Sequence, residues 1–197
     1  MQVVNYGTMP LGGLLAGARL REAGVKDIRV IEKGGDFGGT WYWNRYPGAR
    51  TDSPSHVYQY WFSDELLAEW DWKERFPAQP ETERYLNYVA DKFALRKDIQ
   101  FNTRVTSAEW DDARQVWVVK TDQGDITCEH VVSASGNFAR KTGAMVGLDI
   151  PVIPVEHQYI VTEPHPAIVE RHRLGLPEMG VLREAYSSWY MREEAGG

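Results

Sequence analysis

Apolar runs and glycine-rich turns alternate at the start of the chain. Residues 2–6 form a short apolar run that predicts a first strand, and the alternating residues 28–32 predict a second. The stretch 14–23 between them has a helical pattern, and Gly24 ends it. This order predicts a parallel βαβ unit, in which the helix crosses from one strand to its neighbour.

Glycines and one acid occupy the positions of this unit that contact a dinucleotide in a Rossmann-like fold. The turn departs from the G-x-G-x-x-G pattern, because Met9 replaces the second glycine and the turn has one residue too many. Glu32, 19 positions after Gly13, can accept a hydrogen bond from a ribose hydroxyl. The structural alternative is a helix that starts near Pro10, with Glu32 as a solvated strand end. The predicted cofactor contacts here are Gly7, Gly12, Gly13 and Glu32.

The middle of the chain predicts helices followed by a small sheet. Residues 63–65 start a helix, and an amphipathic helix follows near 81–95. Its apolar stripe of Tyr85, Val89 and Phe93 predicts core packing rather than a site. The next elements expected are strands at 99–101, 104–110 and 116–121, which form a small inserted sheet, and a strand at 128–134.

The last part of the chain predicts pieces of an antiparallel sheet. The elements expected are a helix at 138–146, a strand at 152–162, a helix at 167–173 and strands at 181–183 and 187–192.

An aromatic-rich run, GGTWYWNRYPGARTD at residues 38–52, is unlike these elements. Aromatic side chains need a large apolar surface, small residues let the backbone approach a ligand, and the arginines and aspartate supply charge. This combination suits a flat, partly charged organic cofactor, and a flavin fits it. The structural alternatives are core packing for Trp41 and a turn or cap for Asp52 before Ser53.

Composition and charge exclude several classes of function. The 197 residues carry a formal net charge of −6, which argues against a nucleic-acid-binding protein. No apolar run approaches the roughly 18 residues of a membrane span, and no signal peptide is recognised. The single cysteine, Cys128, argues against disulfides and makes a reducing cytoplasm the expected compartment. No metal site is expected, since no metal-ligand spacing joins His56, His130, His165 and His172.

Residues 1–124 resemble the FAD-binding half of a Baeyer–Villiger (flavin-containing) monooxygenase. The tract GTWYWNRYPG at 39–48 is highly specific to that family, and residues 20–24 and 30–34 match it as well. The resemblance implies FAD as cofactor and NADPH as reductant. The family's second glycine-rich βαβ unit, which binds NADPH, is not recognised after Asp52.

The monooxygenase resemblance also implies roles for individual residues. Gly12 and Gly13 would lie under the FAD pyrophosphate, with Glu32 at the adenosine ribose. Asp52 would point toward the region where flavin and nicotinamide meet and is the catalytic candidate of this half. The further FAD contacts implied are Lys33, Gly39, Thr40, Trp41, Tyr58, Val105 and Gly136.

Residues 125–197 resemble a different flavoprotein family, the dimethylglycine/sarcosine dehydrogenases. The matching segments are 125–132, 143–147, 156–164 and 190–194. The resemblance implies that His157 and Tyr190 face the substrate amine, and both are catalytic candidates. The structural alternatives are a sheet histidine at 157 and a core tyrosine at 190.

The chain therefore looks like a truncated chimera of two flavoproteins. The predicted fold is α/β: a Rossmann-like FAD-binding domain with a small inserted β-sheet at 1–136, incomplete, and a partial antiparallel substrate-domain sheet at 137–197. The predicted function is that of an FAD-dependent oxidoreductase of monooxygenase type. The alternatives are an amine-oxidising dehydrogenase or a non-catalytic FAD-binding fragment. The substrate would be a ketone or an N-methyl amine; the oligomeric state is left open.

Overall fold

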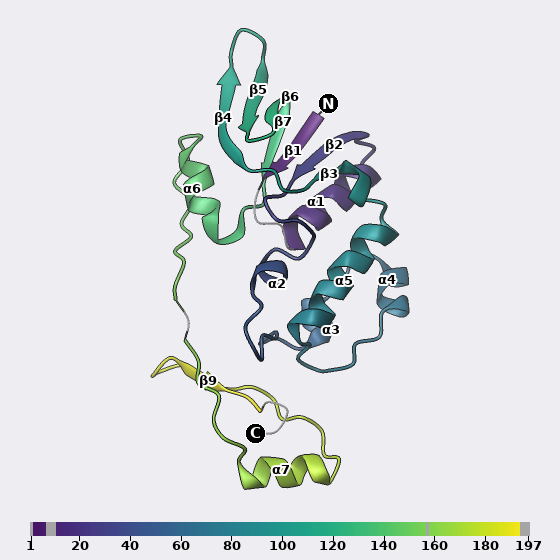
Figure 1. Cartoon of the computed structure of the whole chain (residues 1–197), viewed down its shortest axis with the longest axis vertical. Helices are drawn as coiled ribbons and strands as arrows, with labels where there is room; N and C mark the ends of the chain where they lie inside the picture. Colours follow the sequence, from purple (N-terminus) through teal and green to yellow (C-terminus); the bar gives the residue numbers. More distant parts are fainter. Residues whose placement is uncertain (1, 7–10, 157, 194–197) are drawn as a thin grey trace.

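A parallel sheet lies at the centre of the computed structural model, which describes residues 2–6, 11–156 and 158–193. An antiparallel sheet extends above it, helices pack beside it, and a C-terminal unit lies at the opposite end of the molecule (Figure 1). The spatial order of the parallel strands is β3 (Ile99–Gln100), β2 (Asp27–Ile31), β1 (Gln2–Tyr6) and β7 (His130–Ser133).

The first crossover follows the predicted βαβ order. Helix α1 (Leu11–Glu22) connects β1 to β2, which pair in parallel with Val4 opposite Arg29. On its other side β1 pairs with β7, with Val4 opposite Val131. The predicted α/β fold with a Rossmann-like domain is confirmed.

The inserted sheet contains the two strands expected at 104–110 and 116–121, but its third strand differs from the expected one. It runs in the order β4 (Val105–Asp111), β5 (Val116–Thr121) and β6 (Gly124–Cys128), all antiparallel. The expected first strand, 99–101, was wrongly assigned: its residues form β3, which pairs with Val30 and Ile31 of β2. The reason is that a partly buried two-residue strand gains most by extending the central sheet, where Ile99 packs against the main core.

The single strand expected at 128–134 is likewise divided in two. Cys128 ends β6 and His130 begins β7, with a bend at Glu129 between them. Because β6 pairs antiparallel with β5 while β7 pairs parallel with β1, the chain must change direction between the two sheets.

Besides α1, which contributes Leu14 and Ala18, four further helices pack around the main core beside the parallel sheet. They are α2 (Thr40–Trp43), α3 (Ser55–Tyr58), α4 (Asp64–Glu69) and α5 (Gln79–Lys92). The predicted stripe is confirmed as core, because Tyr85 and Val89 are buried and Phe93 packs partly buried against them. Ser63 starts α4 as expected, and its hydroxyl accepts a hydrogen bond from the Leu66 N–H.

Alkaline pH is expected to weaken this core. Burial raises the pKa of Tyr85 from 10.0 to about 12, although its hydroxyl also accepts a hydrogen bond from the Tyr60 N–H. Below pH 10 the hydroxyl is protonated in both states. Between pH 10 and about 12 only the unfolded state loses the proton, so the free energy of unfolding falls as the pH rises.

Urea denaturation at several pH values measures this slope. Tyr85→Phe should make the alkaline loss shallower, whereas Tyr186→Phe, at a fully exposed tyrosine, should leave it unchanged. An equally steep loss in Tyr85→Phe would contradict the assignment.

The last third of the chain begins with two short helices and ends in a separate unit. Helices η2 (Gly136–Phe138) and α6 (Ala139–Ala144) follow β7, and an extended stretch then leads to α7 (Pro166–Arg173) (Figure 1). Strands β8 (Leu182–Glu184) and β9 (Trp189–Met191) form an antiparallel hairpin after α7, as predicted.

The strand expected at 152–162 is not formed by the residues of that stretch that the structure describes. Pro151, Pro154 and Pro164 lack the N–H group that a sheet needs. Its apolar side chains are accordingly exposed, with Val155 at 81% and Ile160 at 90%. The apolar pattern alone therefore does not make a strand here, because no neighbouring strand pairs with residues 152–156 or 158–162.

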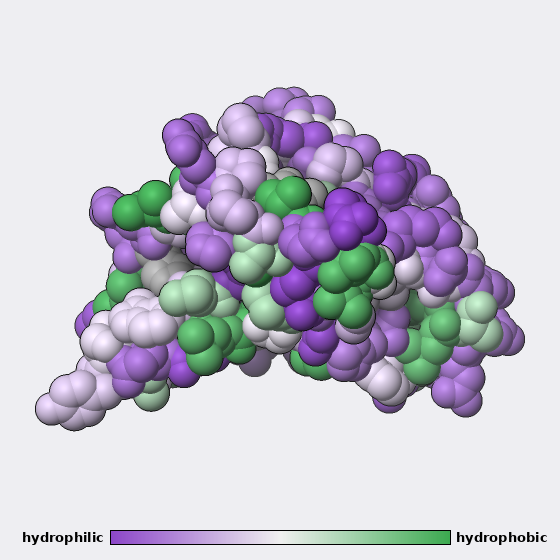
Figure 2. Space-filling model, turned by 90° about the horizontal axis from the view of Figure 1, so that it is seen from below, coloured by the Kyte–Doolittle hydropathy of each residue, from purple (hydrophilic) through white to green (hydrophobic). Residues whose placement is uncertain are grey.

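Polar contacts rather than an apolar core hold the C-terminal unit together. Seen from below, the molecule presents hydrophobic patches separated by hydrophilic residues (Figure 2). Glu193 is buried, and its carboxylate accepts a hydrogen bond from the Met179 N–H. The other carboxylate oxygen lies 3.7 Å from His172 Nε2 and 4.0 Å from Arg171 Nε, which ties the end of β9 to α7.

Candidate functional site

The carboxyl ends of β2, β1 and β7 meet at one edge of the parallel sheet, next to the start of α1. Gly12 and Gly13 lie in the first turn of α1, Gly12 exposed and Gly13 buried. A Cβ added at Gly12 would lie 3.6 Å from Cβ of Ala134, in van der Waals contact, so the start of α1 packs close to the chain just after β7. The predicted contact Gly7 lies outside the described residues.

Glu32 follows β2 directly and is 1% exposed. Its backbone N–H donates to the Gln100 carbonyl and its carbonyl accepts from the Thr103 N–H, both at 3.0 Å. Its carboxylate accepts a hydrogen bond from the Gly34 N–H at 2.5 Å. The acid is therefore held in place at the sheet edge, and the alternative of a solvated strand end is wrong.

Lys33, the next residue, lies at the surface. Its side chain is exposed, and its ammonium lies 5.6 Å from the ring centroid of Trp43, which is itself half exposed. The pair forms a cation–π contact at the surface beside Glu32.

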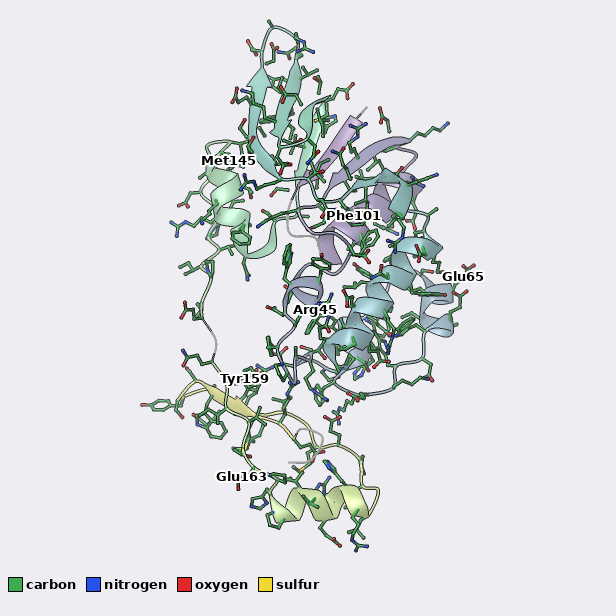
Figure 3. The ribbon with its side chains drawn as sticks, in the orientation of Figure 1. Arg45, Glu65, Phe101, Met145, Tyr159 and Glu163 are labelled. Atoms are coloured by element: carbon green, nitrogen blue, oxygen red, sulfur yellow. The ribbon has the colours of Figure 1, made fainter. Side chains whose placement is uncertain are left out.

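The aromatic run folds into α2 and the loops on both sides of it. Gly38 and Gly39 precede α2 with φ values of 132° and 51°. Thr40 begins the helix and is exposed. Arg45 lies between α2 and α5 (Figure 3), where its guanidinium pairs with Glu83 at 2.5 Å. The run is thus anchored against α5.

Trp41 is buried in the main core. Its indole N–H donates to the Tyr58 hydroxyl at 2.7 Å, and its carbonyl accepts a hydrogen bond from the Gln79 side chain. Burial raises the pKa of Tyr58; the Trp41 hydrogen bond opposes this, and the Asp52 carboxylate adds to it. Trp41 is therefore packed in the core, as the structural alternative for this residue expected. A contact between Trp41 and the flavin stays a prediction. Gln79 was missed by sequence reasoning, because it stands beside Pro80 as an ordinary helix start.

Asp52 is exposed, and the C-terminal hairpin reaches it. Its carboxylate lies 3.7 Å from the Arg183 guanidinium of β8. The same guanidinium lies 5.2 Å from the ring centroid of Tyr190, which stands opposite Arg183 in the hairpin register. Two predicted catalytic residues from distant parts of the chain therefore meet at one arginine, whereas the third, His157, lies outside the described residues.

Further contacts hold the hairpin against the Asp52 loop. Arg192 donates to the Thr51 carbonyl, and Arg75 donates to the Glu178 carbonyl at 3.3 Å. Tyr159, labelled beside the hairpin in Figure 3, packs against Tyr46 with ring centroids 5.9 Å apart. Sequence reasoning missed Arg183, and its only signal was a position in a predicted strand.

Val105 and Gly136 differ in their surroundings. The Val105 side chain is buried in the second core cluster with Ile31 and Val119, and its predicted contact with FAD stays a prediction. Gly136 is exposed with φ 53° and begins η2 directly beyond the end of β7.

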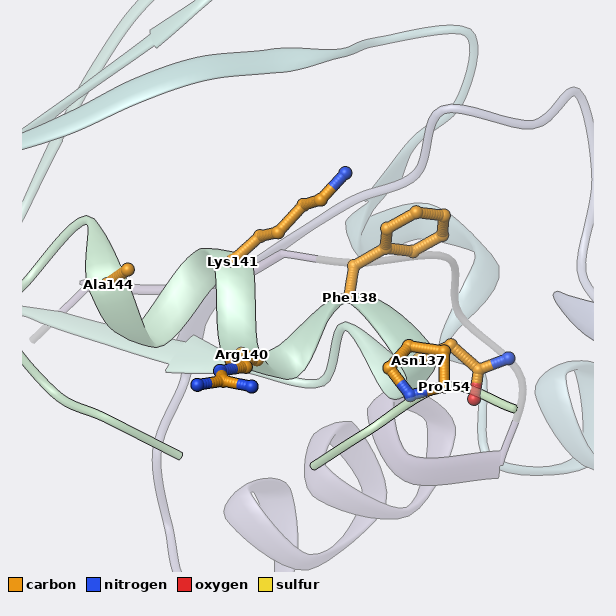
Figure 4. A pocket seen from close by; sticks show the side chains of 6 residues that line it. All are labelled: Asn137, Phe138, Arg140, Lys141, Ala144 and Pro154. Atoms are coloured by element: carbon orange, nitrogen blue, oxygen red, sulfur yellow. The ribbon is translucent and has the colours of Figure 1, made fainter. Parts of the chain in front are cut away.

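A cavity of about 540 Å³ lies next to Gly136. Phe138 and Lys141 extend from the same side of the helical segment, and Arg140 from the other (Figure 4). The Lys141 ammonium lies 5.8 Å from the Phe138 ring centroid, and Arg140 pairs with Asp149 at 3.5 Å. Cationic side chains on an open wall suit an anionic group.

Within residues 2–6, 11–156 and 158–193, no cluster of three or more His, Cys, Asp or Glu side chains could hold a metal ion. In that same part of the chain no helix combines the length and apolar character needed to cross a membrane.

Comparison with protein families gives two matches. Residues 75–197 match the family of FAD-dependent oxidoreductases, and residues 11–69 match an NAD(P)-binding Rossmann-like domain.

Curated relatives are monooxygenases. An acetone monooxygenase (methyl acetate-forming) of Gordonia sp. (strain TY-5) is 47% identical over 131 residues, which are 63% of this chain and 24% of that protein. A Baeyer–Villiger monooxygenase of Streptomyces coelicolor (strain ATCC BAA-471 / A3(2) / M145) is 45% identical over 145 residues, 73% of this chain and 22% of that protein. The chain therefore spans about a quarter of the length of these relatives.

Solved structures agree with this fold. An oxidized steroid monooxygenase bound to NADP has a TM-score of 0.62 and 47% identity, covering 68% of this chain and 25% of that one. A cyclohexanone monooxygenase from Rhodococcus sp. Phi1 bound to NADP⁺ has a TM-score of 0.62 and 39% identity, with the same coverage of both chains.

Proposed function

The chain belongs to the family of FAD-dependent oxidoreductases, whose model matches more than half of it, and we propose that it is the FAD-binding part of a Baeyer–Villiger type monooxygenase. The observation that carries the proposal is the buried Glu32 at the end of β2, beside the start of α1 in a parallel sheet. Identities of 47% and 45% to two monooxygenases support it.

The residues at the sheet edge fit FAD. The first turn of α1, with the exposed Gly12 and with Gly13, would hold the pyrophosphate on free N–H groups. The Glu32 carboxylate would accept a hydrogen bond from the adenosine ribose. When bound, FAD supplies an acceptor for two electrons taken from a reductant or a substrate.

The substrate class and the reductant follow from the monooxygenase resemblance. We propose that NADPH is the reductant and a ketone the substrate of the whole enzyme. Asp52 would stand near the reacting groups, and its carboxylate would be held there by Arg183. A cytoplasmic location remains a proposal that rests on the chain's having a single cysteine, Cys128.

A second candidate is an FAD-dependent amine dehydrogenase of dimethylglycine/sarcosine type. The meeting of Asp52, Arg183 and Tyr190 favours it, because it joins a residue of the tail to the loop that would face the flavin. The family match over residues 75–197 includes the whole tail. The third candidate is a fragment that binds FAD without catalysis. The dehydrogenase candidate includes the proposal that the chain is a chimera of two flavoproteins joined near residue 124.

Spectroscopy of the purified chain separates these candidates. Added FAD should remain with the protein through gel filtration and show a flavin absorbance band. Colourless protein after that step would refute both enzyme proposals. Anaerobic bleaching of the bound flavin by NADPH supports the monooxygenase, bleaching by dimethylglycine supports the dehydrogenase, and bleaching by neither leaves FAD binding alone.

A further inference from the structure

A second cavity, of about 210 Å³, lies between the inserted sheet, β7 and α6. It shares no lining residue with the 540 Å³ cavity beside Gly136. Its walls are mainly apolar and carry no charged side chain; they include Val105, Ala108, Trp117, Val131, Met145 and Ile150. Met145 projects from the turn after α6 at the base of β4 (Figure 3).

Close packing of the chain after α6 forms one wall. The Leu148 N–H donates to the Gly143 carbonyl at 2.9 Å, which turns the chain back over α6. A Cβ at Gly143 would lie 2.7 Å from Cδ1 of Ile150 and 3.0 Å from the Leu148 carbonyl oxygen. A side chain at this position would therefore push Ile150 or the Leu148 backbone aside and alter this wall of the cavity.

The hydroxyl groups at the wall already have partners. Ser133 lies 3.0 Å from both Ser135 and Thr142, and the Ser135 and Thr142 hydroxyls lie 2.6 Å apart. Thr142 also reaches the Ala139 carbonyl at 3.0 Å. Each hydroxyl has one proton, and each proton has an acceptor within this group. These hydroxyls therefore offer no free donor to the carbonyl oxygen of a ligand.

We propose that this cavity binds a small hydrocarbon-like molecule, of the size of benzene or toluene. An apolar cavity of about 150 Å³ can stay dry and hold benzene, so the space here is sufficient. A ketone would leave its carbonyl oxygen without a hydrogen bond from these hydroxyls and would lose the bonds it makes in water. The cavity thus differs in ligand class from the proposed reaction, and the proposal does not rest on FAD binding.

Toluene is the probe for the first test. It should raise the Tm of the full chain in a saturable way, and cyclohexane should bind at least tenfold more tightly than cyclohexanone. Ala108→Leu should reduce toluene affinity at least tenfold by filling the cavity, whereas Ala113→Leu, the same change in the exposed turn between β4 and β5, should not. Absence of a saturable shift, equal loss in both variants, or tighter binding of cyclohexanone would each overturn the proposal.

A second test uses the unmodified chain, in case Ala108→Leu fails to fold. With ¹³C-methyl methionine labelling, the Met145 methyl resonance should move with toluene, while that of Met179, outside the cavity walls, should stay in place. Equal movement of both would overturn the proposal. An apolar side chain of a second copy is the competing occupant. If sedimentation showed that toluene dissociates a dimer, the natural occupant of the cavity would be a side chain of the second copy. That result would also overturn the proposal.

Discussion

Gly38→Ala is expected to destabilise the chain by about 2–5 kcal/mol, because strain and a steric clash add at this position. Gly38 has a φ of 132°, a backbone conformation that residues other than glycine rarely adopt. A Cβ there would lie 2.8 Å from the Tyr42 backbone nitrogen, inside the first turn of α2. Backbone cannot move aside as a flexible side chain can, so α2 must shift. The loss is a large share of the about 5–15 kcal/mol by which a domain is stable.

Gly48→Ala is the matched control for this prediction. Gly48 belongs to the same aromatic-rich run and has φ 76°, but a Cβ there would meet nothing within 4 Å. It should therefore cost only the strain, about 1–3 kcal/mol. Urea denaturation of both variants measures the difference. Equal stabilities would show that the contact between Gly38 and α2 does not matter.

Glu32→Ala is expected to raise the Kd for FAD by about 10- to 100-fold, since a hydrogen bond to a charged group contributes about 1.5–3 kcal/mol. The variant also leaves the buried Gly34 N–H without its carboxylate acceptor, which should lower the free energy of unfolding by about 1–3 kcal/mol. Fluorescence titration with FAD and urea denaturation measure the two effects separately.

Two further variants separate binding from folding. Glu32→Gln keeps an oxygen for the Gly34 N–H, so stability should be largely restored while FAD affinity remains reduced. Glu22→Ala removes an exposed acid that pairs with Arg19 at the far end of α1, and both properties should stay close to those of the unmodified chain. Unchanged FAD affinity in Glu32→Ala would refute the ribose role.

Local patterns predicted the elements that local physics controls. The order of strand, helix and strand, the core stripe of α5 around Tyr85, and the position of Glu32 at a strand end all follow from spacing along the chain. The segment 152–162 has the apolar pattern of a strand, but the residues of it that the structure describes pair with no other strand, and periodicity cannot reveal whether a partner exists. Strand 99–101 was real but joined the central sheet, because pairing depends on which neighbour is within reach.

The candidate site likewise combines features that the sequence predicts with contacts that only the tertiary structure provides. The sequence by itself determined the residue types at the sheet edge, where a glycine-rich helix start and one acid suit a dinucleotide. Only the tertiary structure placed Trp41 in the core, held by Tyr58 and Gln79. It also brought Arg183 between Asp52 and Tyr190. Such contacts join residues far apart in the chain, so they depend on how sheets and loops pack and leave no periodic trace in the sequence.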